Sequence, residues 1–163
     1  MKIIPYKTFL LEEVLKLIKE TIIKINKKDY TDEQVCSWSA IDSEKFKANI
    51  HEFAFVAVNE ANEIIGFINM DHSGYIDHLF THSNYQGQGI ASLLVDTVEE
   101  RCQIHSYTTY ASITAKPFFM SKGFTVVEEN IVILNKEKFL NYYLKKQPSK
   151  LARLFFIRST NHS

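Results

Sequence analysis

The chain has 163 residues, of which 45% are apolar and 13% aromatic, so it can bury the core of one domain and is not intrinsically disordered. Lys plus Arg and Asp plus Glu both total 19, and this zero net charge gives no sign of a nucleic-acid partner. Glu12, Glu13 and Lys16 interrupt the apolar N-terminal stretch, which argues against a signal peptide, and we expect no membrane partner. Cys36 and Cys102 lie far apart without metal-type spacing, so we expect buried, reduced thiols, no metal and a cytoplasmic location.

The first half of the chain changes from helical to extended patterns. After a short strand over residues 3–6, apolar residues from Phe9 to Ile25 recur at three- and four-residue intervals, which predicts an amphipathic helix. Thr31 is a typical N-cap, so a second helix is expected to run to about Trp38. A third short helix is predicted over residues 43–50. Apolar runs between turn residues then predict an antiparallel meander with strands over 53–58, 63–70 and 75–81.

The second half predicts a parallel crossover followed by a closing pair of strands. A helix is expected over residues 89–103, with a buried side formed by Ile90, Leu93, Leu94 and Val98. A strand over 107–113 follows, and then a short helix capped by Thr114 and ended by Gly123. Two strands over 124–134 and 139–145 complete an α+β domain. Because the strand–helix–strand unit over 75–113 requires a crossover, the sheet of six or seven strands is predicted to be mixed, with about four helices.

The segment 84–94, NYQGQGIASLL, places Gly87 and Gly89 one residue apart at the start of a helix. A dinucleotide fingerprint needs a third glycine, where this chain has Ser92, and no Gly-Lys-Ser/Thr follows for a Walker loop. Two interpretations remain. The segment is a tight turn into a helix, or the bare amides of residues 87–92 bind a pyrophosphate at the positive end of the helix dipole.

The stretch QGQGIA, residues 86–91, resembles the [RQ]-x-x-G-x-[GA] pyrophosphate loop of the GNAT superfamily of acetyl-CoA-dependent N-acetyltransferases. IDHLFTHSNYQGQGIASLL also resembles the fourth strand and third helix of that family, and ASITAKPFFMSKGF its fifth strand and fourth helix. DYTDEQVCSW and ITAKPFF are closest to the bacterial YafP-type subgroup. The resemblance covers residues 1–146, which we predict to be one GNAT domain, and leaves residues 147–163 as a basic C-terminal tail.

The resemblance implies a sheet that splays between strands four and five, with acetyl-CoA as co-substrate in the gap. Its pantetheine arm would pair with the backbone of strand four, and its pyrophosphate would lie on the glycine loop. The N–H of Phe80 is expected to hold the oxyanion. The predicted cofactor-binding residues come from strand four, the loop and the segment after strand five: Leu79, Phe80, Thr81, Gln86, Gly87, Gln88, Gly89, Ile90, Ala91, Ser92, Ser112 and Phe119.

The implied reaction is direct attack of a primary amine, expected to be a small molecule, on the thioester through a tetrahedral intermediate. An alkylamine of pKa about 10.4 is mostly protonated at pH 7, and freeing it costs about 4–5 kcal/mol. Asp77 is the predicted catalytic base, because some relatives carry a carboxylate at this position of strand four. The imidazole of His78 is the better base at neutral pH. However, strand alternation predicts that His78 lies on the opposite face of the sheet.

Two positions depart from the pattern of the family. Most relatives have a tyrosine that protonates the departing sulfur where this chain has Phe119, and an asparagine that contacts the pantetheine where it has Ser112. Either Tyr110 or Ser112 is the donor, or the sulfur leaves as a thiolate, which costs only about 2 kcal/mol for a thiol of pKa near 8.5. Phe119 also leaves open a non-catalytic acyl-CoA sensor. Acetylation of a protein or peptide amine is a third alternative.

The acceptor amine is expected between the first two helices and the outer strand ends, lined by Tyr30, Trp38 and Tyr75. This aromatic lining suits a flat or apolar amine, and an arylamine or hydroxylamine would need little help from a base. The tail segment SKLARLFFIRS combines basic residues with helical apolar spacing. Docking on the domain, joining a homodimer and touching a membrane surface all stay open for it.

Overall fold

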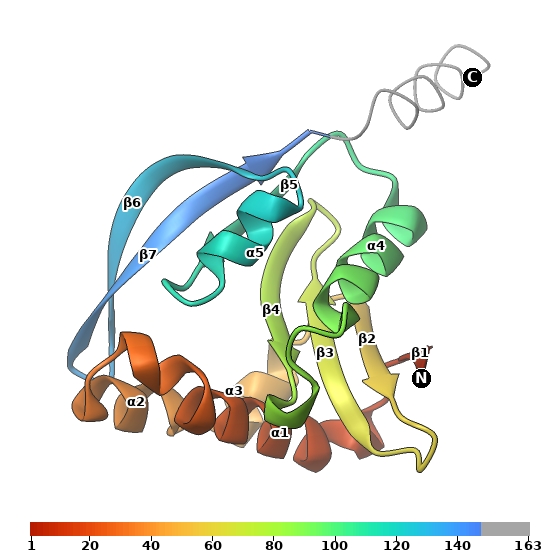
Figure 1. The fold of residues 1–163 in the computed structure, drawn as a ribbon, viewed down its shortest axis with the longest axis horizontal. Coiled ribbons are helices and arrows are strands. Elements are labelled where there is room, and N and C mark those ends of the chain that lie inside the picture. The colour runs from red at the N-terminus through yellow and green to blue at the C-terminus, as the bar shows by residue number, and fades with distance from the viewer. Residues whose placement is uncertain (148–163) are drawn as a thin grey trace.

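Residues 1–147, which the computed structural model describes, form one mixed sheet of seven strands with helices on both faces (Figure 1). The order of the strands is β1-β2-β3-β4-β5-β7-β6, and only the β4–β5 pair is parallel within this part of the chain. The predicted mixed α+β fold is confirmed, with five helices where about four were expected. The strands are β1 (Lys2–Pro5), β2 (Phe53–Val58), β3 (Ile64–Met70), β4 (Tyr75–Thr81), β5 (Tyr107–Ala111), β6 (Thr125–Leu134) and β7 (Glu137–Lys146).

Side-chain caps set the start of two of the helices. The Thr31 side chain accepts a hydrogen bond from the Gln34 N–H, and the Gln34 side chain accepts one from the Thr31 N–H, so the predicted N-cap is a complete capping box. The Asp42 side chain caps the next helix by accepting hydrogen bonds from the N–H groups of Glu44 and Lys45. The helices are α1 (Leu11–Lys24), α2 (Asp32–Ser39), α3 (Ser43–Ala48), α4 (Ile90–Cys102) and α5 (Lys116–Ser121), with 3-10 turns η1 (Thr8–Leu10), η2 (Asn26–Asp29) and η3 (Ser83–Tyr85).

The sheet carries one apolar core on each face, because successive side chains of a strand point to opposite sides. On one face, α1 and α3 cover residues such as Val56 and Phe67. On the other, α4 and α5 cover residues such as Ile68 and Ile76. Figure 1 shows α1, α2 and α3 together on one side, with α4 and α5 on the other. No helix within residues 1–147 is long and apolar enough to cross a membrane.

Three local predictions are wrong. Leu93 is exposed and Val95 is buried instead, because a turn of 100° per residue brings position 95, rather than 93, to the buried side with positions 94 and 98. Thr114 does not cap α5, since its hydroxyl donates to Asp29. Cys36 is exposed, because α2 turns its neighbouring apolar residues toward the core, and Cys102 is only partly buried; both thiols are free.

The β4–β5 junction and the last hairpin position the site. β4 and β5 pair only at Tyr75–Thr108 and Ile76–Thr109 in the described chain, and then separate, as expected for a splayed sheet. The β6–β7 hairpin turns at Asn135 and Lys136, both with positive φ, and arches away from β4 (Figure 1). The predicted basic tail lies outside the described residues, apart from residue 147.

Candidate active site

A cleft of about 190 Å³ opens where β4 and β5 separate. β4 and β5 form its walls, and α1, α5 and the start of α4 close its ends. Its lining mixes apolar surface with a few polar groups, which is the usual make-up of a ligand site. The predicted site residues that line it are Trp38, Asp77, Leu79, Phe80, Thr81, Gln86, Ala91, Ser112 and Phe119.

The backbone of β4 offers unpaired groups to this cleft at alternate residues. The His82 N–H donates to Ile65 O at 2.8 Å, so in the antiparallel ladder Phe80 also turns its N–H and C=O toward β3. Leu79 and Thr81 turn their N–H and C=O groups away from β3. Thr81 O accepts there from Gln86 Nε2 at 2.6 Å. The register therefore argues against the N–H of Phe80 as the oxyanion donor, because it turns the amides of Leu79 and Thr81, rather than that of Phe80, away from β3.

The glycine loop lies at the end of the cleft and leads into α4. Gly87 and Gly89 have φ of +71° and +81°, a left-handed conformation that glycine adopts without cost. A Cβ built on either glycine would meet nothing within 4 Å, so the space above the loop is open. Gly89 is the N-cap of α4, and the amides that follow at Ile90 and Ala91 have no partner inside the helix. This arrangement fits a pyrophosphate group.

A cation lies close to the same helix end. Lys122 Nζ donates to Ser92 Oγ at 2.9 Å and forms an ion pair with Asp96 at 2.7 Å. Gln86 is held by its bond to Thr81, which fixes the start of the loop against β4. The structure thus gathers Gln86 through Ser92 around one open space, and their roles toward acetyl-CoA stay predictions.

Asp77 and His78 lie side by side rather than on opposite faces, so the prediction from strand alternation is wrong. The β3–β4 register shifts between Asn69 and Met70, which leaves Asp77 as the extra residue of a β-bulge. The bulge lets both side chains point the same way, and Asp77 Oδ2 lies 3.7 Å from His78 Nδ1. Asp77 itself lines the cleft, as expected for a base that meets the substrate.

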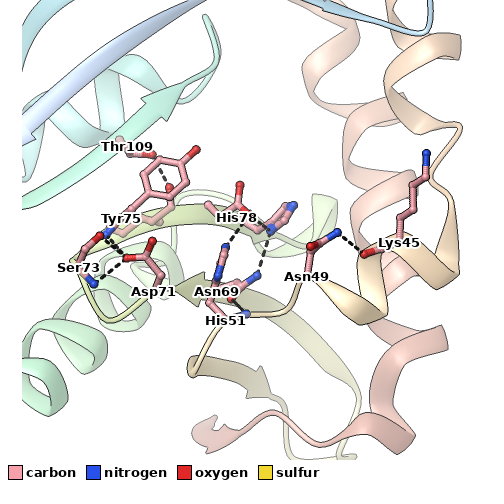
Figure 2. A network of polar contacts seen from close by, with 11 residues as sticks. Lys45, Asn49, His51, Asn69, Asp71, Ser73, Tyr75, His78 and Thr109 are labelled. Atoms are coloured by element: carbon pink, nitrogen blue, oxygen red, sulfur yellow. Dashed lines mark hydrogen bonds and ion pairs between the residues drawn. The ribbon is translucent and has the colours of Figure 1, made fainter.

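His51, which no pattern in the sequence indicates, has its Nε2 3.0 Å from Asp77 Oδ2. Its backbone N–H donates to Oδ1 of the buried Asn69 at 2.8 Å, and Asn69 Nδ2 donates to His78 Nδ1 at 3.2 Å. Figure 2 shows the side chains of His51, Asn69 and His78 converging from three segments of the chain. His51 lies in the irregular link between α3 and β2, where no periodic pattern relates it to Asp77.

His78 is held as a neutral imidazole. Its ring packs against Phe46 and Phe67, with ring centres 5.0 and 6.4 Å away. Burial lowers the pKa of His78 below its ordinary value, an effect that the Asp77 carboxylate opposes and His51 reinforces. Since Nδ1 accepts from Asn69, the remaining proton of the ring is on Nε2. His78 is therefore poorly suited to take up a second proton.

Two of the residues expected near the leaving sulfur are engaged in contacts within the protein. Phe119 is only 2% exposed and packs on Phe118 and Phe124, so it belongs to the core although it also lines the cleft. Ser112 Oγ accepts from the N–H of Ala115 at 3.0 Å. This bond, rather than Thr114, satisfies an amide at the start of α5.

Tyr110 is the more available of the two proton donors considered. Its side chain is exposed, lines the cleft and contacts the rings of Tyr75 and Tyr143. Burial, followed by the charge of Asp77, raises the pKa of Tyr75 to about 12, so that hydroxyl keeps its proton at neutral pH. Among the described residues that line the cleft, Tyr110 is the one tyrosine, so its hydroxyl is the tyrosine proton donor available there.

Of the three residues predicted to bind the acceptor amine, one lines the cleft and two lie beside it. Trp38 lines the cleft and packs on Phe80 and Phe139. Tyr30 packs against Trp38, and its hydroxyl accepts from the Ile113 N–H at 2.9 Å, which ties η2 to the segment after β5. The Tyr75 ring packs edge-on against the Tyr110 ring, with 6.1 Å between the ring centres. Within residues 1–147 no group of three His, Cys, Asp or Glu side chains could hold a metal ion.

Comparison with known proteins shows the family to which the chain is similar. The sequence profile of the acetyltransferase (GNAT) domain family matches residues 26–145. The uncharacterized N-acetyltransferase YafP of Escherichia coli (strain K12) is 34% identical over 122 residues, 73% of this chain and 77% of YafP. A GCN5-related N-acetyltransferase from Rhodopseudomonas palustris superposes with a TM-score of 0.85 at 25% identity, over 90% of this chain and 95% of that one.

A second solved structure, the PaiA N-acetyltransferase from Thermoplasma acidophilum in complex with coenzyme A, shares the fold. Its TM-score is 0.72 at 17% identity, over 90% of this chain and 98% of that one. Family profile, sequence relative and fold point to the same family. The chain belongs to the GNAT family of N-acetyltransferases and is an acyl-CoA-dependent acetyltransferase.

Proposed function

We propose that this protein moves an acetyl group from acetyl-CoA to the primary amine of a small molecule by direct attack of the amine on the thioester. The observation that carries the proposal is the open loop at Gly87 and Gly89, whose bare amides adjoin a cleft with free β4 backbone. A pyrophosphate fits those amides, and an extended pantetheine arm fits the strand edge as an added strand would.

Each part of the cleft has a separate task in this proposal. The Leu79 N–H polarises the thioester carbonyl, because it is a fixed dipole facing the cleft beside the expected reacting carbon. Asp77 takes a proton from the amine, directly or through a water, from its position on the cleft wall. The sulfur leaves as a thiolate, since Phe119 has no proton to give and such departure costs little.

The aromatic side of the cleft supports a flat or apolar amine as acceptor. Trp38 presents its ring there, backed by Tyr30 and Phe139. A cleft of about 190 Å³ has room for the reacting ends of two small substrates rather than for a folded protein surface. These features favour small arylamines, hydroxylamines or aralkylamines over a protein amine.

The same proposal includes a cytoplasmic enzyme with neither nucleic acid nor membrane as partner, and a homodimer. The edge strand β6 supports the homodimer, because it exposes Val127, Ile131 and Ile133 on the outer edge of the sheet. Exposed apolar edge strands favour pairing with another chain.

The test combines calorimetric titration with acetyl-CoA and a thiol-release assay over a panel of amines. Wild type is expected to bind acetyl-CoA and to release thiol with some members of the panel. Asp77→Asn is expected to keep the affinity for acetyl-CoA but to lose turnover, most strongly with alkylamines, which need the base. Glu100→Gln, an exposed carboxylate on α4, serves as the matched control and is expected to behave like wild type.

Two outcomes would contradict the proposal in different ways. Binding of acetyl-CoA without turnover of any amine would favour the non-catalytic acyl-CoA sensor. Failure to bind acetyl-CoA at millimolar concentration and low salt would remove the assignment of the glycine loop altogether.

A further inference from the structure

His51 contacts Asp77 without lining the cleft itself. Its Nε2 lies 3.0 Å from Asp77 Oδ2, while Asp77, but not His51, is part of the cleft wall. The two side chains are 28% and 30% exposed, so the imidazole also has access to solvent. The carboxylate thus lies between the cleft and a histidine that can exchange protons with water.

The position of His51 is fixed by the fold rather than by chance contact. Asn69, fully buried in β3, accepts from the His51 backbone N–H and donates to His78 Nδ1. The bulge in β4 then brings Asp77 within 3.0 Å of His51. One buried amide therefore places both histidines and leaves only the His51 imidazole free to accept a proton from the carboxyl group.

We propose that His51 is a positioning residue that orients Asp77 and carries the proton of the acceptor amine from Asp77 to solvent. The inference rests on the proposed function and deepens it. An imidazole binds a proton more tightly than a carboxylate in water, so a proton that reaches Asp77 passes on to Nε2 of a neutral His51. The carboxylate is thereby returned to its charged state for the next transfer.

The step balances in atoms and charge. A protonated amine first loses one proton through Asp77 and His51 to water. The amine nitrogen then forms a bond to the thioester carbonyl carbon, and the carbon–sulfur bond breaks with its electron pair on sulfur. The nitrogen loses its second proton by the same route, from Asp77 to His51 Nε2, while Nδ1 releases one to water. The products are the amide, the thiolate and two solvated protons.

The charged groups that face His51 come from three neighbouring segments. Asp77 and His78 lie on β4, and Asp71 lies in the β3–β4 turn, where it interacts electrostatically with His51. Glu52 is its neighbour in sequence and pairs with the exposed His72 at 3.5 Å. Of these groups, Asp77 is the one at hydrogen-bond distance from the His51 imidazole.

The experiment measures kcat and KM against pH for His51→Gln with an alkylamine as acceptor, which is protonated at neutral pH, and uses His72→Gln as the matched control. His72 is exposed and lies off the cleft, so its loss is expected to leave both constants within twofold of wild type. For His51→Gln we expect kcat to fall about 100-fold, the usual lower size of a lost acid–base contribution, with KM for acetyl-CoA within twofold. The acidic limb of the kcat profile should move or disappear.

A second pair of variants separates proton transfer from folding. His51→Ala is expected to bind acetyl-CoA normally and to recover at least tenfold in kcat with added imidazole, which a purely structural loss would not do. Adding Asp77→Asn to His51→Gln should lower kcat little further, because groups that act as a unit are not additive. If His51→Gln kept the wild-type kcat and pH profile, or if imidazole did not rescue His51→Ala, this inference would be overturned while the proposed function would stand. A wild type inactive with every amine would overturn the proposed function as well.

Discussion

Replacing either glycine of the loop should separate the affinity for acetyl-CoA from stability. In Gly87→Ala and Gly89→Ala the new methyl group meets no protein atom within 4 Å, so the structural cost comes from positive φ alone. That cost is about 1–2 kcal/mol for an L-residue in the left-handed region. For a domain of this size it lowers the melting temperature by about 2–8 °C, which leaves the protein folded at 25 °C.

The cost to binding is expected to be larger, because the methyl group enters the open space above the helix amides. Losing one or two charge-assisted hydrogen bonds, each about 1.5–3 kcal/mol, raises Kd for acetyl-CoA by about 10- to 100-fold or more. Calorimetric titration measures Kd, and thermal unfolding measures stability. The matched control is Gly123→Ala, which also has positive φ, +94°, and whose Cβ would come no closer than 3.7 Å to Lys146.

Gly123→Ala carries a similar strain at the end of α5, away from the loop amides, so it should lose stability while Kd stays within twofold. The reasoning would be refuted if the loop variants bound acetyl-CoA as tightly as wild type at equal loss of stability. It would also fail if Gly123→Ala weakened binding as much as they do.

Three other variants test the packing, the leaving group and the pH dependence. In Gly66→Ala the Cβ would lie 2.9 Å from Ile90 Cγ2, so we expect a loss of about 1–3 kcal/mol in denaturant unfolding; unchanged stability would contradict this packing of α4 on β3. Tyr110→Phe should keep most of kcat and its basic limb if the thiolate leaves unassisted, and loss of both would identify Tyr110 as the proton donor. Burial opposes ionisation of Asp71, but hydrogen bonds from Ser73 and from the Tyr75 N–H outweigh it and lower its pKa. Asp71→Asn should therefore be less stable than wild type at pH 7, with a difference that disappears as the pH falls below about 4; a difference that persists at pH 2 would contradict it.

Elements governed by local chemistry could be predicted from the sequence. The Thr31 cap, the amphipathic pattern of α1 and the glycines before α4 depend on residues within a few positions, and the structure has each where the pattern indicates. The predictions that are wrong concern side chains whose conformation is decided by a residue far away in the sequence. Thr114 donates to Asp29, which is 85 positions away, and it is Ser112 that accepts from the Ala115 N–H just before α5.

The arrangement around Asp77 was beyond sequence reasoning for a related reason. Strict alternation places neighbours 77 and 78 on opposite faces, and only the register of β4 against β3 reveals the extra residue at 77. The bulge costs a ladder position but brings one carboxylate and two imidazoles into contact, and Asn69 then distinguishes the two rings. A base that works in acetyl transfer needs both an open side toward the amine and a route for the proton it receives. Asp77 has both, since it lines the cleft and contacts His51 from the bulged position, so we regard the register shift as the feature of the fold on which the chemistry of this cleft depends.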